Sequence, residues 1–220
     1  MKNLFIGGSS EIAKKIAKKL KFTESVSRTK VNIYNKNYLI KNYSKKNIIK
    51  IFKKINKKFD NIIIFNGYFS NSFITNYDEK NFNNSFNINF KTPIYIAYLA
   101  INKKIINTNG AIFFISSIAA ESSKTGNAFY SISKNCLNFA AKILGEEQKK
   151  RGVRINIISI GLVKNKMGKS VWTIKIKNNK SIYLNNNKLI SQIIKIIKNK
   201  NINLKKIIIK WLTSLEFIIN

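Results

Sequence analysis

The chain has 220 residues, of which 45% are hydrophobic, and this length and composition fit one domain over residues 1–220 with a sizeable core. It has no histidine, which excludes the Ser-His-Asp triad, the Cys-His dyad and histidine-ligated metal sites, so we expect no metal centre. The formal net charge of +32 favours a nucleic-acid-binding protein, but only three of the 41 basic residues are arginine, the side chain best suited to phosphate and base recognition.

The first part of the chain predicts strands on either side of one helix. Residues 3–8 form a short apolar run that ends in two glycines, which indicates a buried strand and a tight turn. Isoleucine and leucine recur every four residues over 10–21, with lysines on the opposite face, which predicts an amphipathic helix. A second strand is expected over 24–28, and a further strand over either 31–34 or 37–40.

Apolar and amphipathic segments continue to alternate along the rest of the chain. The sequence predicts, in order, a helix over 44–59, a strand over 60–67, a helix over 78–101, a strand over 110–117, a helix over 128–152 and a strand over 153–161. Residues 207–210 are a candidate last strand. Strands that are apolar throughout and alternate with helices indicate a parallel sheet covered on both faces. The predicted fold class is therefore α/β, a doubly wound parallel sheet (Rossmann fold) with three α/β/α layers.

Ligands of such sheets bind beyond the carboxyl ends of the strands. The residues predicted there are small, polar or glycine, at 7–10, 27–28, 65–67, 116–117 and 159–161. Such residues allow a dinucleotide to approach the main chain closely and to form hydrogen bonds with it. We therefore expect a dinucleotide site at this edge of the sheet.

Tyr130 and Lys134 lie four residues apart in a predicted helix, so they share one face. A free tyrosine has a pKa of about 10 and is a poor acid or base near neutrality. A neighbouring ammonium favours the phenolate, and we expect Lys134 to lower the Tyr130 pKa in this way. A surface lysine beside a core tyrosine is the structural alternative. The preceding strand, which ends in Ser116 and Ser117, favours catalysis.

These motifs, in this order, resemble the short-chain dehydrogenase/reductase family over about residues 2–166. Residues 7–13 are similar to its glycine-rich turn, and 65–67 lie where the family has Asn-Ala-Gly. The Tyr-x-x-x-Lys pair and the serine before it match the family's motif at a usual interval. The resemblance implies a Rossmann fold, a nicotinamide cofactor and hydride transfer between a carbonyl and an alcohol.

The resemblance implies a role for each member of the motif. Ser117 would hold the substrate carbonyl and Tyr130 would donate the proton, while hydride arrives from the nicotinamide. Lys134 would also bind the nicotinamide ribose. Asn89, which matches the family's helix asparagine, would hold a water of the proton relay. Ser116 is the alternative to Ser117.

The resemblance also implies which residues contact the cofactor. They are Gly7, Ser9, Ser10, Ile12, Arg28, Asn42, Asn66, Gly67, Tyr130, Lys134, Gly161 and Val163. An acid at the end of the second strand accepts the 2′-hydroxyl of NAD, whereas a base there accommodates a 2′-phosphate. Arg28 stands at that end without an acid beside it, so we expect NADP (NADPH). If the second strand is 31–34, Asn35 and Lys36 stand there and the expectation is unchanged; Asn42 replaces the family's aspartate beside the adenine.

A few positions depart from the family pattern. Glu11 replaces a glycine of the turn, where a positive φ would be costly for a residue with a side chain. Ile160 replaces a proline, and Asn165 stands for a threonine. Residues 167–187 are expected to cover the substrate.

We expect an NADPH-dependent oxidoreductase that reduces the carbonyl of a small-molecule or carrier-protein-bound substrate to an alcohol. Within the family, 3-oxoacyl-(acyl-carrier-protein) reductase of fatty acid synthesis is the expected subfamily, since the spacing from Gly67 to Asn89 fits it without gaps and a minimal genome tends to keep this enzyme. A reductase of a sugar-nucleotide or cell-envelope precursor is the enzyme alternative. By resemblance, a homodimer or homotetramer is expected to form through the helices that carry Asn89 and Tyr130.

The high lysine content is accompanied by an excess of Asn, Ile, Phe and Tyr, residues that share A/T-rich codons. We attribute the charge to a strongly A/T-biased genome and expect no specific nucleic-acid partner, with Arg151 and Arg154 in structural roles. A repurposed fold that binds nucleic acid through its lysines is the alternative outside the enzyme class. The single Cys136 fits a reducing compartment, and no apolar run reaches the roughly 18 residues of a membrane span, so a cytoplasmic location is expected.

Overall fold

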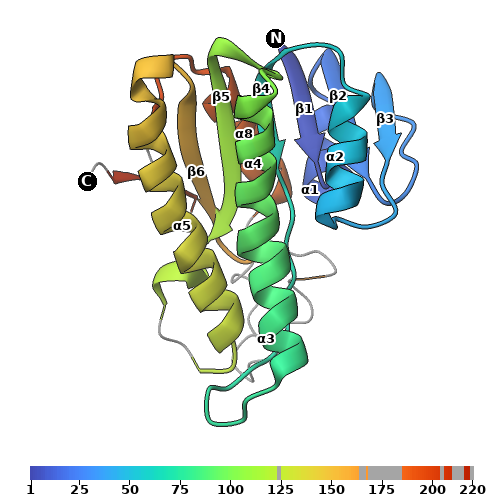
Figure 1. Cartoon of the computed structure of the whole chain (residues 1–220). Helices are drawn as coiled ribbons and strands as arrows, with labels where there is room; N and C mark the ends of the chain where they lie inside the picture. The colour runs from blue at the N-terminus through green and yellow to red at the C-terminus, as the bar shows by residue number, and fades with distance from the viewer. Residues whose placement is uncertain (123–124, 164–166, 168–184, 204–205, 210–215, 219–220) are drawn as a thin grey trace.

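The computed structural model describes residues 1–122, 125–163, 167, 185–203, 206–209 and 216–218. These residues form one eight-stranded sheet with the strand order β3-β2-β1-β4-β5-β6-β7-β8. Helices cover both faces of the sheet: α2, α4 and α5 lie in front of it, and α1 and α8 lie behind it (Figure 1). The predicted α/β class and its three α/β/α layers are confirmed.

The strands are β1 (Lys2–Ile6), β2 (Phe22–Ser27), β3 (Lys36–Leu39), β4 (Phe59–Ile64), β5 (Ile106–Ser117), β6 (Arg154–Ile160), β7 (Lys206–Ile209) and β8 (Glu216–Ile218). β1 to β7 pair in parallel, whereas β8 pairs antiparallel with β7. The predicted parallel sheet is confirmed over β1 to β7, and β8 adds one antiparallel strand at its edge. The residues between β7 and β8 are too few for the crossover of roughly a dozen residues that a parallel pairing needs.

The α-helices are α1 (Glu11–Ala17), α2 (Lys45–Lys53), α3 (Glu79–Phe86), α4 (Thr92–Asn102), α5 (Ala128–Gln148) and α8 (Asn186–Lys198). The predicted helix over 78–101 is present as α3 and α4, joined by a π-helical turn at Asn87–Lys91. The predicted helix over 44–59 ends at Lys53, because Phe59 begins β4. The four-residue spacing of apolar residues continues past the end of this helix and made the prediction too long.

The third strand lies at Lys36–Leu39. Of the two predicted positions for it, 37–40 is therefore close to the observed strand and 31–34 is not. Residues 31–34 instead form no strand, and Tyr34 packs against the turn that follows β1. The ring of Tyr34 is buried there, and its Oη donates to the Gly8 carbonyl (2.6 Å). The strand-like composition of this segment therefore serves side-chain packing.

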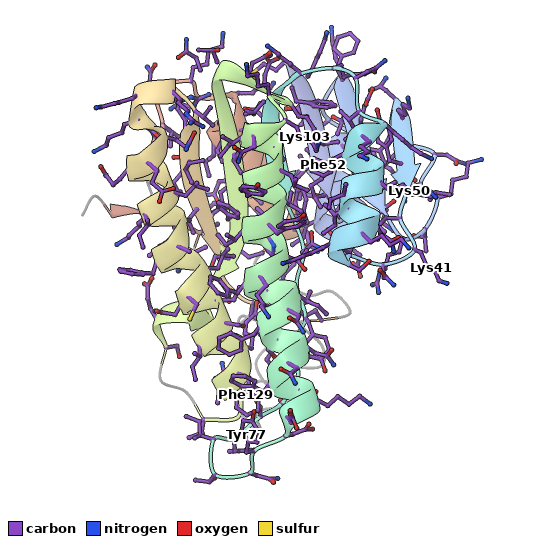
Figure 2. All side chains as sticks on the ribbon, in the orientation of Figure 1. Lys41, Lys50, Phe52, Tyr77, Lys103 and Phe129 are labelled. Atoms are coloured by element: carbon purple, nitrogen blue, oxygen red, sulfur yellow. The ribbon has the colours of Figure 1, made fainter. Side chains whose placement is uncertain are left out.

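Two hydrophobic cores flank the sheet, one under α2, α4 and α5 and the other under α1 and α8. Figure 2 shows Phe52 turned from α2 toward the sheet, whereas Lys50 of the same helix points into solvent. The lysines thus occupy the outer face of an amphipathic helix, as their spacing predicts. Within the described ranges, no helix is long and apolar enough to cross a membrane.

Arg154, the first residue of β6, joins separate segments of the chain. Its guanidinium donates to the main-chain carbonyls of Asn109, Asn199 and Ile202 at 3.1–3.2 Å. Asn109 belongs to β5 and Asn199 ends α8, so one side chain ties a strand to a helix end. The structural role predicted for Arg154 is confirmed, and Arg151 lines a groove between α4 and α5.

Candidate active site

The carboxyl ends of the parallel strands meet at one edge of the sheet, the lower edge in Figure 1. In the register of the sheet, Ile6 of β1 lies beside Ile64 of β4, and Ser117 of β5 lies beside Ile160 of β6. The predicted site residues that end or follow these strands therefore lie along this edge, namely Gly7, Asn66, Gly67, Ser117 and Gly161.

Tyr130, in the first turn of α5, faces Ser117 at the end of β5. The Ser117 hydroxyl group lies close enough to Tyr130 to lower the pKa of its phenol, and Ser117 Oγ accepts from the Ala119 N–H (3.2 Å). Ser116 is buried on the opposite face of the strand, because successive strand side chains alternate. The Phe69 ring packs edge-to-face on the Tyr130 ring, with 5.2 Å between centroids. Of the two candidate serines, Ser117 is therefore the one that contacts the tyrosine.

Burial raises the pKa of Tyr130 above its ordinary value, and the nearby Ser117 hydroxyl group opposes this effect only in part. The sequence predicts the reverse, a Tyr130 pKa lowered by Lys134. That prediction is wrong for this structure, because the buried phenol loses solvation while the lysine ammonium donates to main-chain carbonyls. The phenol therefore stays protonated near neutrality, which suits a proton donor.

Lys134 lies one turn further along α5, and its side chain is almost wholly buried. Its Nζ donates to the main-chain carbonyls of Ile115 (3.0 Å) and Asn66 (3.4 Å). These carbonyls belong to β5 and to the segment after β4, so the lysine links two strand ends that flank the site. Burial lowers the pKa of Lys134 to about 8, because a charged ammonium is poorly solvated there.

Asn89 lies in the π-helical turn and is fully buried. Its Oδ1 accepts from the Tyr68 N–H (2.7 Å), and its Nδ2 donates to the Tyr68 carbonyl (2.9 Å) and to Ser133 Oγ (3.0 Å). Ser133 in turn donates to the Tyr130 carbonyl (2.8 Å). Through these hydrogen bonds, the Asn89 side chain connects the loop after β4 to α5. Both of its amide hydrogens are used, which leaves a relay water only an oxygen lone pair of the side chain or the main-chain carbonyl.

The turn between β1 and α1, Gly7–Ser10, begins with two glycines, which leave its main chain uncovered by side chains. Gly7 has φ +80°, a conformation that favours glycine. A Cβ added to Gly8 would lie 2.5 Å from Ser25 Cβ, so no side chain fits there. Ser10 caps the amino end of α1. The turn therefore allows a phosphate-bearing ligand to approach its main chain closely.

The predicted strain at Glu11 is absent. Glu11 is the first residue of α1, where φ is negative, and in the described part of the chain only Lys104 and Asn109 combine a side chain with a positive φ. The expectation was wrong because the helix begins at this position, so the backbone does not require glycine there.

Asn66 and Gly67 follow β4. Asn66 Oδ1 is buried, and no described residue donates a hydrogen bond to it. A Cβ on Gly67 would meet Met167 Cε at 3.4 Å. Three features suit the phosphates and ribose hydroxyls of a nucleotide: the turn after β1 with its accessible main chain, the buried hydrogen-bond acceptor after β4 and the Lys134 ammonium. The residues present therefore fit the nicotinamide nucleotide that the fold implies.

Arg28 directly follows β2 and is exposed, where the sequence places it. The neighbouring main chain is held in place, because Ser27 Oγ donates to the Thr29 carbonyl (2.7 Å) and Asn37 Nδ2 donates to Ser27 Oγ (2.8 Å). Asn42 lies just before α2, and its Oδ1 accepts two hydrogen bonds from the amino end of that helix. Its oxygen thus caps local structure, while Arg28 lies directly after the carboxyl end of β2.

Other predicted cofactor contacts are limited to the main chain. Ile12 and Val163 have buried side chains in the core under α1 and α8, so a nucleotide can meet only their main-chain atoms. The Gly161 N–H donates to the Ile209 carbonyl (3.0 Å), and Ser9 is half-exposed in the turn.

Much of the predicted substrate cover lies outside the described residues. Of the predicted cover, residues 167–187, the structure describes only Met167 and residues 185–187. Asn165 also lies outside the described residues.

Sequence reasoning missed two aromatic residues at this edge, Phe69 and Tyr43. Phe69 covers the Tyr130 ring, and Tyr43 Oη accepts from the Gly7 N–H (3.1 Å). An aromatic residue shortly after a strand is the only local signal. That signal is weak in a sequence with 15 phenylalanines and 9 tyrosines.

Known proteins are similar to this chain in sequence. A family model described as enoyl-(acyl carrier protein) reductase matches residues 10–196. The chain is 32% identical over 110 residues to a 3-oxoacyl-(acyl-carrier-protein) reductase of Rickettsia conorii, covering 50% of this chain and 46% of the relative. It is 29% identical over 99 residues to dehydrogenase/reductase SDR family member 4 of Homo sapiens, covering 45% and 36%. The matched segment thus spans less than half the length of either relative.

Solved structures share the fold over almost the whole chain. A short chain dehydrogenase family protein from Francisella tularensis has a TM-score of 0.82 at 17% identity, covering 94% of this chain and 96% of that chain. A 4-hydroxyisoleucine dehydrogenase complexed with NADH has a TM-score of 0.77 at 18% identity, covering 96% and 97%. Since the family model spans most of the chain, this protein belongs to the short-chain dehydrogenase/reductase family of oxidoreductases, whose members bind a nicotinamide nucleotide, NAD(H) or NADP(H).

Proposed function

We propose that the chain is an NADPH-dependent reductase that converts a carbonyl into an alcohol, with 3-oxoacyl-(acyl-carrier-protein) as its substrate. The observation that carries the proposal is that Tyr130 lies beside Ser117 at the strand edge, one helical turn from the buried Lys134. The name of the Rickettsia conorii relative supports the substrate class.

The side chains of the site have different roles in carbonyl reduction. Ser117 holds the carbonyl oxygen beside Tyr130, whose raised pKa keeps the phenol proton available for donation. A reduced nicotinamide nucleotide, which the turn after β1, Asn66 and Lys134 would hold, would supply the hydride to the carbonyl carbon. The carbonyl oxygen takes the Tyr130 proton, so the product is the alcohol and a phenolate remains. The Ser117 hydroxyl group, which lowers the pKa of Tyr130, stabilises that phenolate until a proton returns from solvent.

The substrate is tested by turnover with NADPH on a 3-oxobutanoyl group attached to acyl carrier protein and, in parallel, on a keto-sugar nucleotide. Reduction of the carrier-bound ketone alone is the expected result. Reduction of the sugar nucleotide alone would favour the alternative, a reductase of a cell-envelope precursor. No turnover of either substrate, nor of a simple 3-oxo ester, would contradict a carbonyl reductase.

Arg28 is expected to set the preference for NADPH. Arg28→Asp should weaken NADPH binding by about 10-fold to 100-fold and favour NADH, because a charge-assisted hydrogen bond to the 2′-phosphate is replaced by repulsion. Calorimetric titration with both nucleotides measures the change. Arg151→Asp, at the far end of α5 from Tyr130, is the matched control and should leave both affinities unchanged. Tighter binding of NADH than NADPH by the unmutated chain would contradict this prediction.

We also infer that the chain assembles through α4 and α5. Exposed large apolar side chains lie on these helices, namely Tyr98 on α4 and Ile132, Phe139 and Ile143 on α5. A groove of about 560 Å³ between the two helices adjoins them. Exposed apolar surface of this kind is typical of an interface between proteins, which supports a homodimer or homotetramer.

Phe139→Glu is expected to shift this assembly to monomers, because it places a charge at the centre of the apolar face. Light scattering at micromolar concentration measures the mass. Phe22→Glu is the matched control, since Phe22 is about as exposed (59% against 66% for Phe139) but lies at the start of β2. An unmutated chain that is monomeric at this concentration would contradict the inference.

A further inference from the structure

Ser72, in the loop after β4, contacts the amino end of α5 through its side chain and its main chain. Ser72 Oγ accepts a hydrogen bond from the Phe129 N–H (3.0 Å), and the Ser72 carbonyl accepts from the Ala128 N–H (3.1 Å). The Ser72 N–H donates to the Gly126 carbonyl (3.0 Å), so that Ser72 pairs in parallel with Asn127. Figure 2 shows Phe129 at the lower end of α5. A loop that is distant in sequence is therefore bonded directly to the start of this helix.

The amino end of α5 lacks the usual local cap. The N–H groups in the first turn of a helix have no partner within the helix, and the residue before the helix commonly supplies a side-chain acceptor. Asn127 occupies that position in α5, but its side chain forms no capping hydrogen bond. Ser10 of α1 and Ser44 of α2 do form one. Ser72 thus supplies from another segment the acceptor that a local serine supplies in those two helices.

The loop that carries Ser72 also contacts the tyrosine of the site. The Phe69 ring packs edge-to-face on the Tyr130 ring, with 5.2 Å between centroids. The Asn89 side chain holds the Tyr68 main chain through two hydrogen bonds (2.7 and 2.9 Å), so residues 68–72 are fixed at both ends. Because Tyr130 lies in the first turn of α5, a shift of the amino end of this helix would shift the phenol as well.

We propose that Ser72 is a positioning residue for carbonyl reduction: its hydrogen bonds fix the amino end of α5 so that the Tyr130 hydroxyl group stays beside Ser117. The proposal rests on the proton-donor role of Tyr130 in the function proposed above. Ser72 is only 5% exposed and acts through the main chain of the helix.

Replacement of Ser72 by alanine tests this role. Ser72→Ala removes Oγ and keeps the main-chain hydrogen bonds. It is expected to lower kcat by about 10-fold to 100-fold, because a slightly displaced proton donor transfers its proton more slowly. KM for the ketone and the NADPH affinity should change little, since the lost effect acts in the transition state. Steady-state turnover and calorimetry measure these quantities.

Ser44→Ala is the matched control, because it removes the same hydroxyl group from the cap of α2, where Ser44 Oγ accepts from the Asn47 N–H (3.4 Å). Loss of a helix cap should lower the urea midpoint of unfolding in both variants. Only Ser72→Ala should also lower kcat. An unchanged kcat in Ser72→Ala, or equal losses of kcat in the two variants, overturns the proposal.

A double-mutant cycle shows whether Ser72 acts through Tyr130. Once Tyr130→Phe has removed the proton donor, adding Ser72→Ala should not lower the residual turnover further. A second loss of the same size overturns the proposal. Ser72→Cys replaces Ser72→Ala in both experiments if the alanine variant does not fold, because cysteine is similar in size and its sulfur is only a weak acceptor. A Ser72→Cys protein with the kcat of the unmutated chain likewise overturns the proposal.

Hydrogen exchange of the Phe129 amide measures the contact itself. This exchange is expected to be about fivefold to tenfold faster in Ser72→Ala or Ser72→Cys than in the unmutated chain, because the amide loses a good acceptor. Equal exchange rates overturn the proposal. An unmutated chain that reduces no carbonyl would contradict the proposed function, whereas an active chain whose kcat does not depend on Ser72 would contradict this inference alone.

Discussion

Replacement of Tyr130 by phenylalanine is expected to lower the rate of carbonyl reduction by about 10²–10⁴-fold while nucleotide affinity changes little. Phenylalanine keeps the ring and, with it, the edge-to-face contact with Phe69. It removes only the hydroxyl group that lies beside Ser117 and that is the proposed proton donor. Consumption of NADPH measures turnover, and calorimetry measures binding.

Tyr77→Phe is the matched control for this experiment. The Tyr77 ring also packs against an aromatic ring, that of Phe129 at 5.6 Å, and Figure 2 shows the pair at the lower end of α5. Tyr77 is exposed, so loss of its hydroxyl group should leave turnover unchanged. If Tyr130→Phe were fully active on a ketone that the unmutated chain reduces, Tyr130 would not be the proton donor. The four-residue spacing of Tyr130 and Lys134 would then be a coincidence.

Lys134→Met is expected to remove a pH dependence of folding stability. Burial lowers the Lys134 pKa from 10.5 to about 8 in the folded chain. Between these values the unfolded chain binds more protons than the folded chain, so this lysine adds stability as the pH rises from 8 to 10.5. The unfolding free energy of the unmutated chain should therefore rise relative to that of the variant by up to about 3 kcal/mol over this range.

Urea unfolding of both proteins at several pH values measures this difference, in which the titration of all other shared groups cancels. Lys142→Met, an exposed lysine on the same helix, is the matched control, and its difference from the unmutated chain should stay flat. If the unfolding free energies of Lys134→Met and of the unmutated chain changed in parallel from pH 8 to 10.5, the lowered pKa of Lys134 would be contradicted.

The alternation of strands and helices was predictable because its signals are local. Apolar runs marked β1, β4, β5 and β6, and Gly152, with φ +69°, ends the segment after α5 as expected. Prediction failed where a local pattern fits two structures. Phe59 continues the spacing of α2 but begins β4, and residues 31–34 have a strand composition although the Tyr34 hydroxyl group binds the Gly8 carbonyl.

The order of the motifs placed Ser117, Tyr130 and Lys134 at a common edge, and the structure brings them together. The direction of the Tyr130 pKa shift could not be predicted, because it depends on burial to which distant residues such as Phe69 contribute. Tyr43 was missed for the same reason. Its hydroxyl group meets strand ends that only the folded sheet brings to one point.

Arg154 limits how freely this chain can exchange one cation for another. Its planar guanidinium serves three carbonyls of separate segments at once, which the compact ammonium of a lysine cannot do without leaving an acceptor unpaired. An arginine-to-lysine change costs little on most of the surface but is penalised here. Only three of the 41 basic residues of the chain are arginine, and Arg154 is therefore a position that requires the planar shape of the guanidinium as well as its charge.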